Sequence, residues 1–271
     1  MNGVHSSSTT YWEASTLSRV PAQRDPYDRF AAEYDWLATD EMVSGDAFWN
    51  RFGDCLDGLT RGSRVLDCAC GTGYNTLALV QHGFRVTASD VSEAMLVEAR
   101  RRLGDRAAVH RCAWTNLPDL FTEPFDVVVC AGNSLIHAGD KSGMTNALTG
   151  MAGVLQPGGL LLLDTRNWET MRREQPRLQV PHPPHRREAR SAVSVYSWHW
   201  PKAWNEAHHL EILVIVSDEH RTTTSRTEIT FYPFRFSELT QRLEQAGFEI
   251  QSHTYRTGTD FYEVTACRSA D

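Results

Sequence analysis

The sequence predicts an α/β protein: a doubly wound parallel sheet with a small antiparallel β lobe inserted after the fifth strand. Between residues 64 and 166, short apolar segments alternate with helix-like segments, as is typical of a parallel sheet covered by helices on both faces. The alternation then stops. Three strand-like segments at 192–200, 208–218 and 226–234 follow one another without intervening helices. Strands joined without a crossover are expected to pair antiparallel.

Two amphipathic helices, predicted at 27–42 and 44–59, precede the parallel part of the sheet. The five strands of that part are expected at 64–69, 84–90, 108–114, 125–132 and 160–166. The helices that connect them are expected at 74–82, 92–104 and 145–159. A further helix at 237–248 and strands at 249–255 and 261–268 follow the antiparallel strands. The antiparallel lobe therefore lies between the fifth strand and the last helix.

These elements divide the chain into four parts. A polar, Ser/Thr-rich segment occupies 1–26, and the core with its N-terminal helices occupies 27–171. The inserted lobe or lid is expected at 172–228, and the C-terminal part of the core sheet at 229–271. The lobe begins with a Pro/Arg/His-rich stretch, 172–190, that has no apolar period, so we expect this stretch to be mobile.

The composition is that of a globular protein with an ordinary core. Of the 271 residues, 41% are hydrophobic and 23% are charged. The formal net charge of −7 argues against binding along a phosphate backbone, which requires a basic surface. No apolar run approaches the roughly 20 residues that span a bilayer, and the first residues lack the apolar segment of a signal peptide. We expect a cytoplasmic protein without nucleic-acid or membrane partners, and leave a homo-oligomer open.

The spacing of cysteines and histidines predicts no metal site. Four of the six cysteines lie in or beside expected central strands: Cys68, Cys70, Cys112 and Cys130. Free cysteine packs there as a small apolar residue, and no CxxC pair is present. His208 and His209 are adjacent in a strand, so their side chains point to opposite faces. His182 and His185 lie in a proline-rich segment, and no further potential metal ligands stand at a characteristic spacing from them.

A glycine loop between the first strand and the next helix predicts a nucleotide site. Gly71 and Gly73 flank the turn, and Asp90 ends the following strand, where an acid can bind ribose hydroxyls. A dinucleotide loop would have a third glycine where this chain has Thr76. Asp67, just before the loop, would repel a pyrophosphate but suits a ligand with a positively charged amino-acid end. The pattern favours S-adenosylmethionine, with a nicotinamide cofactor as the alternative.

Several stretches resemble a known family. LDCACGTG, VTASD and the QPGG turn are similar to the class I S-adenosylmethionine-dependent methyltransferases. CAGNSLIHAGD (130–140), LLLDTRNWETM (161–171) and ITFYPF (229–234) resemble glycine N-methyltransferases and the related glycine/sarcosine enzymes. The resemblance is clearest over 64–171. It implies a Rossmann-like methyltransferase sheet, S-adenosylmethionine as the cofactor and S-adenosylhomocysteine as the product.

The resemblance also implies which residues bind the cofactor. They are Tyr27, Trp36, Asp67, Ala69, Gly71, Gly73, Asp90, Ala113, Trp114 and His137. Trp114 would cover the purine, and His137 would lie near the methionine moiety. Tyr27 and Trp36 match aromatic residues that close over the cofactor in similar enzymes. The alternatives are that the aromatic residues pack in the core and that His137 satisfies a loop backbone.

The acceptor residues implied by the resemblance are Asn133, Arg166 and Tyr232. Arg166 follows the fifth strand at the carboxyl edge of the sheet, and its guanidinium could hold a substrate carboxylate through two hydrogen bonds. The alternative is that Arg166 pairs with a local acid such as Asp164 or Glu169. Methyl transfer from a sulfonium is a direct displacement, so positioning residues matter more than a catalytic triad.

The sequence thus predicts an S-adenosylmethionine-dependent N-methyltransferase that acts on the amine of a small carboxylate-bearing acceptor such as a glycine-like amino acid. A second hypothesis is O- or N-methylation of a larger specialised metabolite, because the lobe carries Tyr196, Trp198, Trp200 and Trp204, which the family pattern does not contain. A third is a non-catalytic sensor or scaffold that binds the same cofactor. No counterpart of the family's cofactor-binding arginine is found in 37–50.

Overall fold

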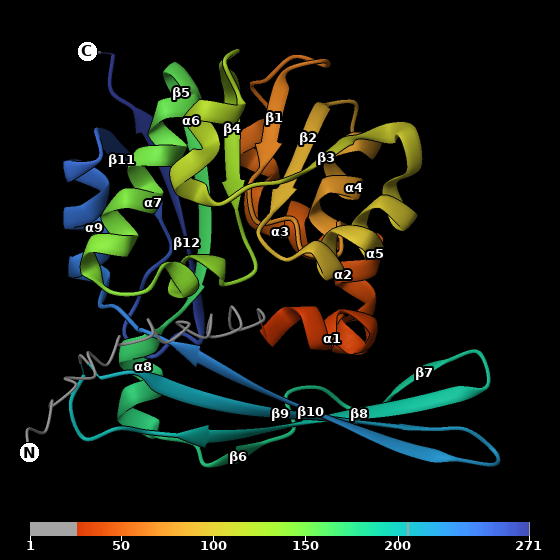
Figure 1. Ribbon diagram of the computed structural model, residues 1–271. Helices are drawn as coiled ribbons and strands as arrows, with labels where there is room; N and C mark the ends of the chain where they lie inside the picture. The colour runs from red at the N-terminus through yellow and green to blue at the C-terminus, as the bar shows by residue number, and fades with distance from the viewer. Residues whose placement is uncertain (1–25, 205, 271) are drawn as a thin grey trace, which may run out of the picture.

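Two β-sheets, one of seven and one of five strands, organise the residues that the computed structural model describes, 26–204 and 206–270 (Figure 1). Helices cover both faces of the larger sheet, and the smaller sheet lies against one end of it. The predicted polar segment, 1–26, lies outside the described residues except for Pro26, which begins the first helix.

The larger sheet has the strand order β11-β12-β5-β4-β1-β2-β3. Its strands are β1 (Arg64–Asp67), β2 (Arg85–Asp90), β3 (Ala108–Arg111), β4 (Phe125–Cys130), β5 (Leu155–Arg166), β11 (Phe248–His253) and β12 (Phe261–Arg268). Strands β1 to β5 pair in parallel, and β12 pairs antiparallel with both β5 and β11. The strand order reverses at β1, between β4 and β2. The crevice beyond the carboxyl ends of these strands is where ligands bind in such sheets.

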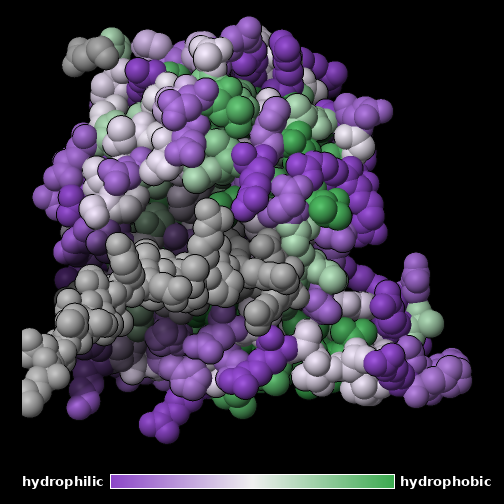
Figure 2. Space-filling view, in the orientation of Figure 1, coloured by the Kyte–Doolittle hydropathy of each residue, from purple (hydrophilic) through white to green (hydrophobic). Residues whose placement is uncertain are grey.

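The helices of the core alternate with these strands. They are α1 (Pro26–Tyr34), α2 (Asp40–Ser44), α3 (Asp46–Leu56), α4 (Tyr74–Gln81), α5 (Glu93–Leu103), α6 (Leu117–Leu120), α7 (Lys141–Val154), α8 (Trp168–Glu174) and α9 (Phe236–Gln245). Four 3₁₀ turns, η1 (Asp35–Leu37), η2 (Gly104–Arg106), η3 (Trp114–Asn116) and η4 (Ser134–Ala138), complete the described helical elements. Hydrophilic side chains predominate on the face shown in Figure 2, as expected where amphipathic helices turn polar sides to solvent.

Two predicted helices differ from those observed. The helix predicted at 27–42 is broken after Tyr34, and a new helix, α2, begins where the Thr39 side chain accepts a hydrogen bond from the Met42 N–H. The helix predicted at 145–159 begins earlier, because the Asp140 carboxylate accepts the Ser142 and Gly143 N–H groups. That helix ends at Val154, and the QPGG turn belongs to β5 instead.

The smaller sheet is antiparallel, as predicted, and is inserted after β5. Its strands are β6 (Leu178–Gln179), β7 (His185–Arg187), β8 (Arg190–His199), β9 (His208–Ser217) and β10 (Thr222–Phe231). The Pro/Arg/His-rich stretch 172–190 holds β6 and β7, which pair with β8. The mobility expected for this stretch stays a prediction. Strand β10 runs past residue 228, so the sheet extends into the part assigned to the core from 229.

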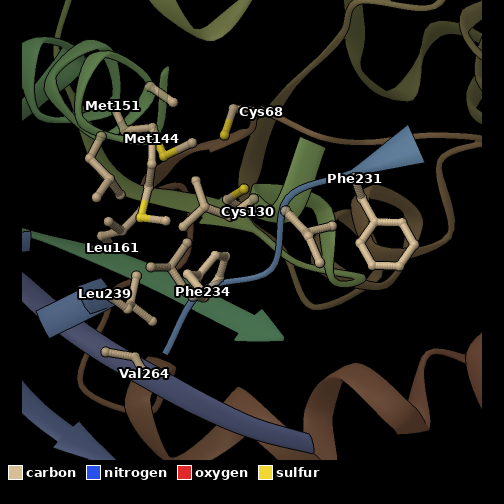
Figure 3. Close-up of a cluster of buried hydrophobic side chains, with 14 of the residues drawn as sticks. Cys68, Cys130, Met144, Met151, Leu161, Phe231, Phe234, Leu239 and Val264 are labelled. Atoms are coloured by element: carbon tan, nitrogen blue, oxygen red, sulfur yellow. The ribbon is translucent and has the colours of Figure 1, made fainter. Parts of the chain in front are cut away.

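One apolar cluster joins the two sheets. Figure 3 shows Cys68 and Cys130 from the larger sheet in the same cluster as Phe231 from the smaller one. Trp198 is buried in this cluster, where its ring packs against Trp168 and stacks on Trp200. The tryptophans at 198 and 200 therefore pack the lobe onto the core. Among the described residues, no helix has the length and apolar character that crossing a bilayer requires.

Candidate functional site

A cavity of about 490 Å³ opens at the carboxyl ends of β1, β2 and β4. This volume lies within the range of roughly 300–1,000 Å³ typical of small-molecule sites. The glycine loop, the turns after β3 and β4, and helix α1 form its walls. Seven of the predicted cofactor residues line it: Tyr27, Ala69, Gly71, Asp90, Ala113, Trp114 and His137. Asp67, Gly73 and Trp36 do not.

The glycine loop approaches the cavity through Gly71 and turns into α4 at Gly73. Both residues have positive φ, +51° and +91°, which disfavours any side chain. A Cβ atom on Gly73 would also lie 3.3 Å from the Leu103 side chain of α5. Gly73 therefore shapes the turn and its packing, while Gly71 faces the ligand space.

Asp90 is held in place by the backbone around it. Its Oδ2 accepts the Gly71 N–H at 2.9 Å, and its Oδ1 accepts the Ser92 N–H at 3.0 Å. A carboxylate can accept more hydrogen bonds than these two. Asp90 also lines the cavity, so its carboxylate lies where a ligand in the cavity would meet it.

Trp114 forms another wall of the cavity. Its indole Nε1–H donates to the Cys68 carbonyl oxygen at 2.8 Å, which fixes the plane of the ring. Helix α7 packs closely behind it, since a Cβ atom on Gly150 would lie 2.0 Å from the Trp114 carbonyl oxygen. The position of the ring is therefore set by β1 and α7, and it suits stacking on a purine.

Tyr27 and His137 meet across the cavity. The Tyr27 hydroxyl and His137 Nε2 lie 2.9 Å apart, although the two residues come from α1 and from η4. His137 lines the cavity and is exposed there. The protein around the cavity lowers the pKa of its imidazole. The contact between Tyr27 and His137 ties α1 to the turn after β4.

Asp67 lies beneath the glycine loop, away from the cavity wall. Its Oδ2 accepts the Thr76 hydroxyl at 2.6 Å, while its Oδ1 is buried without a hydrogen bond among the described residues. Burial raises the pKa of this carboxyl to about 7, although the hydrogen bond from Thr76 opposes the shift. Asp67 therefore lies below the loop and forms no part of the cavity wall.

We expect the free energy of unfolding of the cofactor-free protein to fall as the pH rises from about 4 to 7, because the Asp67 pKa is higher in the folded than in the unfolded chain. The raised pKa gives stability that is present below the unfolded value and lost as the pH rises through the folded value. The contribution is up to about 4 kcal/mol. Asp67→Asn, which keeps an acceptor for Thr76, should remove it. Urea unfolding at pH 5 and 8 measures this, and identical pH slopes for both proteins would contradict it.

Trp36 lies outside the cavity. Its ring is buried, and the guanidinium groups of Arg187 and Arg190 each lie 5.6 Å from its centre. Trp36 thus packs η1 against the smaller sheet. Tyr34 also lines the cavity, although it was not among the predicted residues. It follows Tyr27 by seven residues, or two helical turns, and this spacing indicates that both lie on the same face of a helix.

Arg166 lies at the end of β5, beside the cofactor cavity and not in its wall. Its guanidinium carbon is 4.7 Å from the centre of the Phe261 ring and 5.8 Å from that of Trp198. Over 26–204 and 206–270 it forms no side-chain hydrogen bond or ion pair. Burial lowers the pKa of Arg166, and the nearby Tyr196 and Asp260 oppose that shift. The guanidinium is thus partly desolvated, and Asp260 is the nearby acid whose charge acts on it.

The local acids suggested as alternative partners of Arg166 are bound elsewhere. The Asp164 carboxylate forms an ion pair with Arg51 of α3 and accepts the Asn133 N–H. The Glu169 carboxylate accepts the Phe236 N–H and the Tyr255 hydroxyl.

Asn133 and Tyr232 lie outside the cofactor cavity as well. Asn133 has φ +60°, and its Oδ1 accepts both the Arg166 N–H and the Thr165 hydroxyl. Asn133 therefore joins the ends of β4 and β5 and fixes the backbone of Arg166. Tyr232, just after β10, is 38% exposed. Its N–H donates to the Ile136 carbonyl oxygen.

The topology, the glycine loop and Asp90 at the end of β2 belong to a Rossmann-like fold, the fold of the S-adenosylmethionine-dependent methyltransferases that superpose on this chain. Residues 65–159 match a family model described as a methyltransferase domain. A solved S-adenosylmethionine-dependent methyltransferase from Clostridium acetobutylicum superposes with a TM-score of 0.70 at 18% identity, covering 90% of this chain and 100% of that one. A sugar N-methyltransferase from Streptoalloteichus superposes with a TM-score of 0.68 at 20% identity, covering 98% and 100%.

In sequence, the chain is similar to glycine N-methyltransferases and glycine/sarcosine N-methyltransferases. The enzyme of Rattus norvegicus is 39% identical over 120 residues, which cover 39% of this chain and 41% of that protein. A glycine/sarcosine N-methyltransferase of Parasynechococcus marenigrum is 34% identical over 148 residues, which cover 53% and 50%. These matches confirm the resemblance predicted from the sequence. The chain spans about half the length of the curated relatives it matches.

Proposed function

We propose that this chain transfers a methyl group from S-adenosylmethionine to the amine of a small carboxylate-bearing acceptor. The observation that carries the acceptor class is the guanidinium of Arg166, which has no hydrogen bond or ion pair among the described residues and lies next to the cofactor cavity. A partly desolvated arginine is stabilised by an anionic partner, and a carboxylate matches its two-point geometry. The similarity to glycine N-methyltransferases supports the same class.

The residues around the cavity fit the cofactor. Asp90 would hold the ribose hydroxyls, Trp114 would cover the adenine, and Tyr27 with His137 would close the side formed by α1. Asp67 would face the positively charged amino-acid end from below the glycine loop. When bound, the cofactor supplies an activated methyl group. No cluster of metal-binding side chains occurs within the described ranges.

The chain's own residues would then orient the acceptor. Arg166 would fix the acceptor carboxylate, with Asn133 holding the Arg166 backbone at the end of β5. The acceptor amine would face the cavity in its neutral form, and its proton would pass to solvent after transfer. Tyr232 remains a proposed wall of the acceptor space. Exclusion of water by α1 and the smaller sheet would complete the arrangement.

A larger acceptor is the second candidate, and the Streptoalloteichus neighbour, a sugar N-methyltransferase, supports including amino sugars among the compounds tested. The Trp-rich segment gives this candidate little support, because two of its tryptophans have contacts within the protein. Trp198 is buried against Trp168, and the Nε1–H of Trp200 donates to the Pro176 carbonyl. The proposal also includes a cytoplasmic location and a small-molecule acceptor, without a nucleic-acid or membrane partner, and it leaves a homo-oligomer open.

The test is a mass-spectrometric methylation assay with S-adenosylmethionine and a panel of glycine-like amino acids, their amides, amino sugars and phenols. We expect methylated product from an amino acid and much less from its amide. Product only from amino sugars or phenols would favour the larger-metabolite function. Tight cofactor binding with no product across the panel would favour a sensor or scaffold.

A further inference from the structure

One ion pair connects helix α5 to the turn η1 that follows α1, and the glycine loop is hydrogen-bonded to both of its members. The Arg102 guanidinium of α5 lies 2.6 Å from Asp35 Oδ2 in η1, and it also donates to the Thr72 carbonyl oxygen. The Thr72 hydroxyl donates to the other Asp35 oxygen at 3.1 Å. Both oxygens of one carboxylate are thus used, one by the loop that lines the cavity and one by the helix behind it.

The pair is sheltered from solvent. The Arg102 side chain is 14% exposed and that of Asp35 is 24% exposed. The Arg102 guanidinium carbon also lies 3.7 Å from the centre of the Tyr74 ring, and Tyr74 is another residue of the cavity wall. A shielded ion pair with several partners is less screened than a surface pair, and it favours one arrangement of its elements.

Asp35 follows α1 directly, and α1 forms one side of the cavity through Tyr27 and Tyr34. In Figure 1, α1 lies between the helices of the core and the smaller sheet. Besides this ion pair, the described polar contacts that hold the segment include the Tyr27–His137 hydrogen bond and the Arg187 guanidinium, which donates to the Ala38 carbonyl. These contacts together hold the segment that forms one side of the cavity.

We propose that the Asp35–Arg102 ion pair is a latch that holds α1 closed over the cofactor and sets the rate at which the cofactor and its demethylated product leave. Asp35 and Arg102 are positioning residues, because neither lines the cavity. This inference rests on the proposed cofactor. Its effect is on dissociation, since the latch acts on the closed complex.

The test is a double-mutant cycle read by stopped-flow dissociation of S-adenosylhomocysteine. Asp35→Asn keeps an acceptor for Thr72, and Arg102→Met keeps an apolar stem over Tyr74. Each should raise the dissociation rate about five- to twentyfold, with a much smaller change in the association rate. The double variant, which contains no unpaired charge, should release the ligand no faster than the faster single variant.

The matched control is the ion pair between Arg100 and Glu93 of the same helix, which is also 2.6 Å long but has side chains that are 44% and 48% exposed, respectively. Glu93→Gln and Arg100→Gln should leave the dissociation rate unchanged. Amide hydrogen exchange over 27–37 in the cofactor-free protein gives a second readout, which should quicken in Asp35→Asn and not in Glu93→Gln.

The latch is contradicted if the double variant releases the ligand at a rate within twofold of the wild-type rate. It is also contradicted if the control variants raise the dissociation rate as much as Asp35→Asn and Arg102→Met do. Calorimetry of the wild-type protein separates this from failure of the proposed function. If the wild type binds the ligand and the variants release it at the wild-type rate, only the latch is wrong. If the wild type binds none, both are wrong.

Discussion

Replacing Asp90 by alanine is expected to weaken the binding of S-adenosylmethionine by about 1.5–3 kcal/mol, because the charge-assisted hydrogen bonds to the ribose are lost. Isothermal titration calorimetry measures this as a rise in Kd of roughly ten- to 150-fold. Part of the loss comes from the loop itself, since the N–H groups of Gly71 and Ser92 lose their acceptor in the same substitution.

Asp126→Ala is the matched control for that loss. The Asp126 carboxylate accepts the Arg64 N–H at 2.7 Å, so Asp126, like Asp90, is hydrogen-bonded to the backbone. It lies at the opposite end of β1 and β4, away from the cavity. Cofactor affinity should be unchanged in Asp126→Ala. Unchanged affinity in Asp90→Ala would contradict the ribose assignment, and tight binding of NAD by the wild type would contradict the cofactor class.

The sheet and part of the cavity wall could be predicted because local patterns determine them. Alternating apolar strands and helices specify a parallel sheet, and the carboxyl ends of its strands lie at one edge, so Gly71, Asp90 and Trp114 meet there whatever the rest of the chain does. The cofactor class followed from the same few residues, since the loop has no third glycine and follows an acid.

The remaining parts depend on contacts between distant segments, which local patterns do not report. The apolar spacing over 27–42 is compatible with one helix, but the helix breaks where Asp35 meets Arg102 and Thr72, from 37 to 67 positions away. The QPGG turn was predicted as the end of a helix, yet Leu155 pairs with Phe125 of β4. Asp67 was expected at the ligand, and the folded loop places it underneath.

The acceptor residues show the same limit. Sequence spacing placed Asn133 and Arg166 at neighbouring strand ends, and the two are hydrogen-bonded there. Spacing could not decide whether Arg166 has a local partner. That depended on Arg51 from α3, which forms an ion pair with Asp164, and on Tyr255, which donates to Glu169. Because both acids are bound elsewhere, Asp260 is the remaining acid whose charge acts on Arg166, and a ligand carboxylate is the partner that we propose.

Arg166→Lys is therefore expected to lower kcat/KM for a carboxylate-bearing acceptor by roughly ten- to a hundredfold, about 1.4–2.7 kcal/mol of transition-state stabilisation. Lysine keeps the charge but loses the planar, two-point geometry. Steady-state methylation kinetics measure the loss, and cofactor affinity by calorimetry should barely change, since Arg166 lies outside the cofactor cavity. Arg172→Lys is the matched control, because that guanidinium donates to the Pro201 and Lys202 carbonyls.

A change in the acceptor, combined with Arg166→Lys, tests whether Arg166 contacts the acceptor directly. Converting its carboxylate to an amide should reduce turnover strongly in the wild type and little in Arg166→Lys, because both changes remove the same contact. Such non-additivity separates a direct contact from a structural effect, which would lower the turnover of acid and amide alike. If the wild type methylates the amide as well as the acid, Arg166 has a structural role, and the larger-metabolite function becomes the better account of the site.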